Sequence, residues 1–134
     1  MPSAADVGDR SGGAHDFAVI EQRLDDRTTV IAVEGELDLA TAPQLKWRLV
    51  DALEQGRSCV VVDLAGVTFM DSTALGVLVG VRRSLHVGVR MGIVCTNPNV
   101  LNIFQLSGLD GAFEIFPTRD GALAYARGEE APRS

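Results

Sequence analysis

Apolar and polar residues alternate along 17–23, and a β-branched run occupies 28–34. The polar tetrapeptide LDDR separates the two stretches. A period of two is typical of a half-buried strand. Two such runs joined by a short polar turn predict an antiparallel hairpin.

The pattern then changes to a helical one. Leu45 and Leu49 belong to a series of apolar residues spaced three or four apart, which predicts an amphipathic helix. Thr41 and Gln44 have the spacing of a capping box at its start, and Gly56 is placed to end it.

Apolar runs and helical patterns continue to alternate in the second half of the chain. The nearly continuous apolar run 59–64 predicts a central strand that is covered on both faces. A helix of about 14 residues, ending near Gly88, is predicted after it. The remaining elements are expected to be a strand at 89–96, a helix from Asn97 to Gly108, a strand at 113–116 and a helix from Thr118 to Arg127.

This order predicts an α/β fold with a mixed sheet of four to five strands and about four helices. The hairpin is antiparallel, and the later strands are parallel because helices connect them. Loops that follow parallel strands lie at one edge of the sheet. We therefore expect Asp38, Asp71, Ser72 and Asn97 to be neighbours.

The 134 residues are enough for one domain, which we place at 16–127. Residues 1–15 and 128–134 are small and polar, with no periodicity, and are expected to be tails. The net charge of −6 argues against binding to nucleic acid or to an anionic membrane. No apolar run is long enough to span a bilayer and no signal peptide is evident, so we expect a cytoplasmic protein.

Several residues are expected to have structural roles only. Cys59 and Cys95 are predicted to be buried thiols at opposite ends of parallel strands, and their spacing fits no zinc site. Trp47 is expected on the half-buried flank of the first helix. Arg82, Arg83 and Arg90 lack interleaved aromatic residues and are assigned to solvated helix ends.

The sequence carries none of the common catalytic motifs for hydrolases, phosphate loops, dinucleotide binding or zinc peptidases. His86 lies 14 residues beyond Ser72 on the same predicted helix, about 21 Å away, so the two cannot form a dyad. The other histidine, His15, falls in the predicted tail, and the single lysine, Lys46, belongs to the first helix. We predict no catalytic residue, no metal site and no cofactor.

Three polar residues at the sheet edge remain. Asp38 and Asp71 either brace their loops or form a metal or acid/base pair. Ser72 is predicted to be a helix N-cap or a phosphorylation site, and the two roles are compatible. A helix N-terminus would favour a phosphate dianion, but the neighbouring Asp71 would oppose it.

Three segments carry a resemblance to a known family. GELD at 35–38, FMDSTALGVL at 69–78 and LSGL at 106–109 together resemble the STAS family, and within it the bacterial anti-sigma factor antagonists. The resemblance covers roughly 17–127 in order and spacing. One departure is Ala74, where the family often has glycine.

The resemblance implies a non-enzymatic STAS domain that binds an anti-sigma factor, a serine kinase with an ATPase fold, and so releases a sigma factor. It implies that this kinase phosphorylates Ser72 and thereby breaks the complex, and that a PP2C-type phosphatase restores it. Asp38 would lie beside the serine. Asp71, Thr73 and Gly76 are the other predicted neighbours of the phosphosite and contacts of the partner.

Two alternatives stay open. The domain could serve another assembly, such as a lipid-transport ATPase subunit or a stress-signalling scaffold, although the lipid role needs no phosphoacceptor. A small hydrolase or nucleotide-binding enzyme at the edge with Asp38 and Asp71 is the third hypothesis. A deep pocket at that edge would support it.

Overall fold

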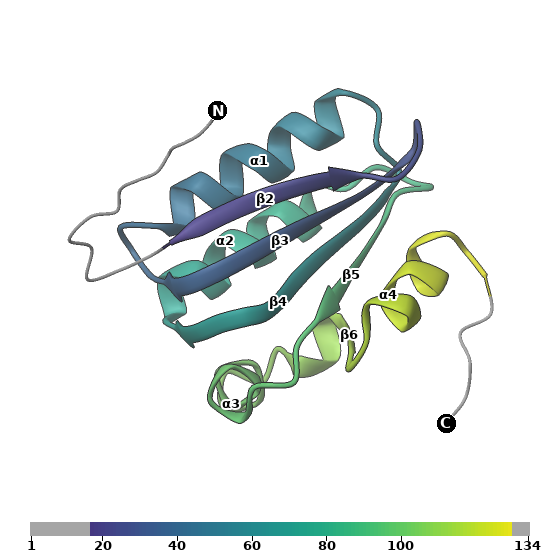
Figure 1. Ribbon diagram of the computed structural model, residues 1–134. Helices are drawn as coiled ribbons and strands as arrows, with labels where there is room; N and C mark the ends of the chain where they lie inside the picture. Colours follow the sequence, from purple (N-terminus) through teal and green to yellow (C-terminus); the bar gives the residue numbers. More distant parts are fainter. Residues whose placement is uncertain (1–16, 130–134) are drawn as a thin grey trace.

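A computed structural model describes residues 17–129, which form one five-stranded sheet and four α-helices (Figure 1). The strands are β2 (Ala18–Arg23), β3 (Thr28–Leu37), β4 (Cys59–Met70), β5 (Arg90–Val94) and β6 (Glu114–Phe116). The helices are α1 (Ala42–Glu54), α2 (Ser72–Arg83), α3 (Pro98–Leu106) and α4 (Arg119–Ala126), with a short 3₁₀ turn at Asp110–Ala112. The tails predicted at 1–15 and 128–134 lie, except for 128 and 129, outside the described residues.

The strands lie in the order β2-β3-β4-β5-β6. β2 pairs with β3 in the antiparallel sense, and the other three pairs are parallel. The predicted hairpin, the mixed sheet and the order of elements are therefore confirmed.

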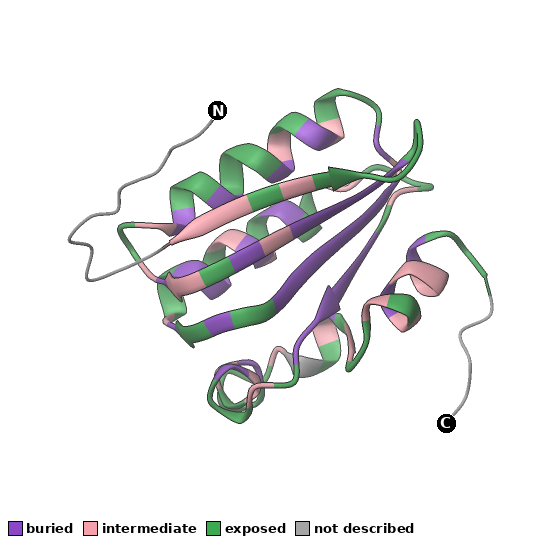
Figure 2. Cartoon of the chain, in the orientation of Figure 1, coloured by how far each residue is buried: buried purple, intermediate pink, exposed green. Residues whose placement is uncertain are grey.

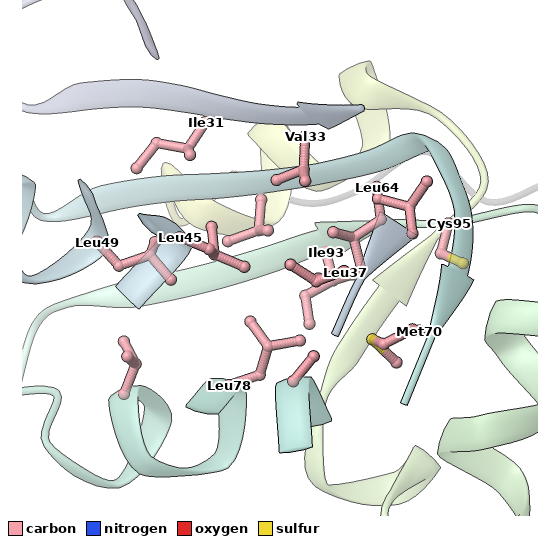
Figure 3. Close-up of a cluster of buried hydrophobic side chains, with 14 of the residues drawn as sticks. Ile31, Val33, Leu37, Leu45, Leu49, Leu64, Met70, Leu78, Ile93 and Cys95 are labelled. Atoms are coloured by element: carbon pink, nitrogen blue, oxygen red, sulfur yellow. The ribbon is translucent and has the colours of Figure 1, made fainter. Parts of the chain in front are cut away.

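The main core lies between the sheet and the helices on one of its faces (Figure 3). Leu45 and Leu49 of α1 and Leu78 of α2 are fully buried there, together with residues of β3, β4 and β5. Phe104 of α3 belongs to the same cluster. The outward faces of these helices are exposed, while β4 and β5 are buried along most of their paired length (Figure 2).

α4 covers the opposite face of the sheet with a smaller apolar cluster that includes Val61 and Ala122. Arg119, at its first turn, donates from Nη2 to Asp63 Oδ2 at 2.7 Å, and Asp63 is only 8% exposed. A second nitrogen of the guanidinium, Nη1, donates to Gln22 of β2 at 2.9 Å. This side chain therefore ties α4 to both β4 and β2.

Two strands are longer than predicted. β3 continues to Leu37, and β4 continues to Met70, through a segment that the sequence assigns to a loop. β5 ends at Val94, opposite Asp63, so the outer half of β4 has β3 as its only strand neighbour. Its residues are largely exposed there, and the apolar run that marks the first half of the strand is lost.

The helix caps are confirmed in part. The side chains of Asn97 and Thr118 accept from backbone N–H groups in the first turns of α3 and α4, as predicted. Thr41 holds the N-cap position of α1 but makes no side-chain cap, so the capping box with Gln44 is wrong. α2 ends at Arg83, and His86 lies beyond it in an exposed turn.

The two cysteines are free and buried, as expected. Burial raises the pKa of the Cys95 thiol, which keeps this group protonated. In the hairpin turn, hydrogen bonds from the backbone N–H groups of Arg27 and Thr28 lower the pKa of Asp25.

Candidate functional site

Asp71 connects the end of β4 to the start of α2. Its Oδ1 accepts from the backbone N–H of Ala74 at 3.0 Å, which makes Asp71 the N-cap of α2. Its other oxygen, Oδ2, accepts from the backbone N–H of Leu39 at 3.2 Å. The carboxylate thus fixes the helix start and also joins it to the loop after β3.

Ser72 is the first residue of α2 and is exposed. The interpretation of Ser72 as an N-cap is wrong, because the preceding aspartate takes that position. The sequence alone does not show which residue caps the helix, because Asp71, Ser72 and Thr73 are consecutive and all three residue types are good N-caps. The Ser72 hydroxyl makes no hydrogen bond within the described residues, and the residue is exposed to solvent.

Asp38 organises the turn between β3 and α1. Its Oδ1 accepts from the backbone N–H groups of Ala40 and Thr41 at 3.0 and 3.1 Å. The hydroxyl of Thr41 accepts from the backbone N–H of Asp38 and donates to the carbonyl of Glu36. Asp38 therefore braces its loop, which is one of the two roles predicted for it.

The loops that contain Asp38 and Ser72 meet as predicted. Besides the bond from Leu39 to Asp71, the backbone N–H of Asp71 donates to the carbonyl of Leu37 at 3.2 Å. Asn97 bonds to β4 and not to these two loops. Its side chain donates to the carbonyl of Val67 at 3.2 Å. It supports the same edge without bonding to the other three residues.

The exposed side of α2 continues away from Ser72 through Thr73 and Gly76, which are both exposed. Leu39 is not among the residues that the sequence predicts for this site, yet it is 71% exposed and lies beside Asp71. Its only sequence signal is an apolar residue inside a polar turn. A single exposed leucine is common on protein surfaces, so Leu39 alone does not mark a contact surface.

Trp47 is placed differently from the prediction. It is 64% exposed on the outer side of α1, rather than on a half-buried flank. The ammonium of Lys46 lies over its ring at 5.7 Å from the centroid. Arg82 and Arg83 lie in the last turn of α2, which agrees with a role at the helix end. For Arg90 the prediction is wrong, because this residue begins strand β5.

The geometry does not favour an enzyme at this edge. Both oxygens of Asp71 and Oδ1 of Asp38 accept from backbone N–H groups, so the two carboxylates are used to hold their loops. Neither aspartate lines any of the main cavities formed by residues 17–129. Within the same residues, no group of three or more histidine, cysteine or acidic side chains could hold a metal ion.

The family model of the STAS domain matches residues 19–122. The chain belongs to the STAS domain family. It is 30% identical over 104 residues to the anti-sigma-F factor antagonist RsfB of Mycobacterium tuberculosis. This alignment covers 78% of the chain and 85% of RsfB. The predicted family is thereby confirmed.

Solved structures agree with this assignment. The crystal structure of an anti-sigma factor antagonist from Mycobacterium paratuberculosis is similar with a TM-score of 0.78 and 29% identity, over 84% of this chain and 95% of that one. The anti-sigma factor antagonist SpoIIAA of Bacillus in its unphosphorylated form has a TM-score of 0.71 and 28% identity to this chain. The match covers 84% of this chain and 99% of SpoIIAA. The phosphorylated form of SpoIIAA has a TM-score of 0.62 and 25% identity, over 81% of this chain and 98% of that one.

The names of these relatives describe antagonists of other proteins and no catalytic activity. This agrees with the prediction of a regulatory protein rather than an enzyme. Among residues 17–129, no helix combines the length and the apolar character that crossing a bilayer requires.

Proposed function

We propose that this STAS domain is an anti-sigma factor antagonist whose binding is switched off by phosphorylation of Ser72. In the unmodified state it binds an anti-sigma factor that is also a serine kinase with an ATPase fold, and a sigma factor is released. A PP2C-type phosphatase restores the binding form. Such a role places the chain in the cytoplasm with the transcription machinery.

The observation that carries the proposal is the position of Ser72. It is exposed, it opens α2, and it directly follows the aspartate that caps this helix. A kinase can reach such a hydroxyl without unfolding the domain. SpoIIAA, a structural relative, is known in a phosphorylated form, which supports modification as the means of control.

Electrostatics explain how one phosphate can end binding. A phosphoserine carries a charge of about −1.5 to −2 at neutral pH. It would directly follow Asp71, whose carboxylate is bonded to the loop that also contains Asp38. Transferring this added charge into a protein interface without a cationic partner costs several kcal/mol. Since about 1.4 kcal/mol corresponds to a tenfold change in affinity, this is enough for a switch.

The same position favours the proposal over a STAS module of a lipid-transport assembly, because that role needs no accessible phosphoacceptor. The enzyme hypothesis is not supported, since both aspartates are engaged in their loops.

Phosphorylation can be tested with purified anti-sigma factor kinases from the source organism. Incubation of the chain with kinase and ATP is expected to add the mass of one phosphoryl group, which peptide mapping places on Ser72. Thr73→Ala should be modified as the wild type is, and Ser72→Ala should stay unmodified. Modification of Ser72→Ala to the same extent would contradict the proposed site.

A further inference from the structure

A groove runs between α1 and α2 on the side away from the sheet. Its volume is about 530 Å³. α2 contributes Thr73, Gly76 and Gly80, Ser84 follows the end of α2, and α1 contributes Lys46 and Val50. Because Thr73 follows Ser72 in the chain, one end of the groove begins at the proposed phosphosite.

The two glycines in this groove have no role in packing within the domain. A Cβ atom built at Gly76 or Gly80 would meet nothing within 4 Å. Glycine lowers the stability of a helix interior relative to alanine. The described fold gains nothing from the missing side chains, whereas a partner could approach α2 closely because they are missing.

One cationic side chain, that of Lys46, lines the groove. Lys46 is the only lysine of the chain, whose net charge is −6. Within residues 17–129 it forms no ion pair, and its ammonium lies over the Trp47 ring at 5.7 Å from the centroid. The rest of the lining is mainly apolar, with Val50, Val77 and Val81, and its polar members are Thr73 and Ser84. A matching occupant is therefore apolar along its length and carries a carboxylate where it passes Lys46.

We propose that this groove receives an apolar, carboxylate-bearing segment of the anti-sigma factor, so that the docking surface extends from Ser72 along α2 to Gly80. The proposal rests on the proposed function. Ser72 provides the switch at one end, and the groove provides the apolar contact that holds the unphosphorylated complex. A second copy of this chain is the competing occupant.

Filling the groove tests this directly. Gly80→Leu places a side chain in the groove and is expected to lower the affinity for any anti-sigma factor that binds the wild type by at least about tenfold. Arg83→Leu adds an exposed apolar side chain to the same helix but does not line the groove, and should bind as the wild type does. Thermal unfolding followed by circular dichroism should show that Gly80→Leu is folded.

Lys46→Glu tests the charge. It is expected to weaken binding more than Arg48→Glu, which makes the same change of charge on the same helix outside the groove. Equal effects of the two variants would indicate long-range electrostatics only and would overturn the predicted contact with Lys46.

The outcomes separate this proposal from the proposed function. If Ser72→Asp weakens binding but Gly80→Leu and Lys46→Glu do not, the groove proposal is wrong and the proposed function stands. If no anti-sigma factor binds the wild type, both are wrong. If sedimentation shows a dimer that Gly80→Leu dissociates, the occupant is a second copy and the proposal is overturned.

Discussion

Ser72→Asp and Ser72→Glu are expected to bind the anti-sigma factor at least about 100-fold more weakly than the wild type, whereas Ser72→Ala binds as tightly or more tightly. The hydroxyl is exposed and makes no hydrogen bond in the described structure, so its removal leaves no polar group unpaired. A carboxylate at the same position must be desolvated beside Asp71 when the complex forms. Isothermal titration calorimetry measures the three affinities.

Asn99→Asp is the matched control for this comparison. Asn99 is exposed in the first turn of α3, so the substitution adds the same charge at another helix start of this domain. It should change the affinity by less than about threefold, since exposed charges are screened by salt. Tight binding by Ser72→Asp, or a loss of binding in Ser72→Ala, would contradict the role of Ser72.

Phe104→Ala is expected to lower the free energy of unfolding by about 3–5 kcal/mol. Phe104 is 0% exposed. Its ring packs edge to face on Phe113 at a centroid distance of 5.4 Å, so the truncation opens a cavity and removes an aromatic contact. Urea denaturation followed by circular dichroism measures the change; Trp47 is 64% exposed and is a poor probe of unfolding.

The control for this prediction is Leu106→Ala on the same helix. Leu106 is 77% exposed, and its truncation should change the stability by less than about 0.5 kcal/mol. If Phe104→Ala were as mild as Leu106→Ala, α3 would not be packed as described.

The order of elements could be predicted from the sequence because each core element keeps its period. Leu45 and Leu49 keep a helical period and are buried, and the strand around Val61 is nearly continuously apolar because helices cover both faces. The meeting of the loops with Asp38 and Asp71 could be predicted as well, since it follows from parallel strand pairing.

The outer half of β4 could not be predicted. The register with β3 shifts between Ala32 and Glu34 and again between Gly35 and Glu36, which breaks the alternation of buried and exposed residues. A Cβ atom at Gly66 would lie 2.9 Å from the Glu34 side chain, so the strands approach closely at this irregularity. A glycine in an exposed stretch is read as a loop when only the sequence is known.

Other features depend on how the helices pack. Helical spacing gives the buried side of α1 but does not tell how far Trp47 turns toward solvent. The groove depends on the distance between α1 and α2, which no local pattern encodes. Gly76 and Gly80 are visible in the sequence, but that nothing packs against them is visible only in the fold.

Displacement of a sigma factor tests the central claim most directly. The chain is added to a preformed complex of the anti-sigma factor and its sigma factor, once unmodified and once phosphorylated on Ser72, and the released sigma factor is measured. We expect release by the unmodified chain and little or none by the phosphorylated chain. Equal release by both forms, or release by neither, would contradict the account.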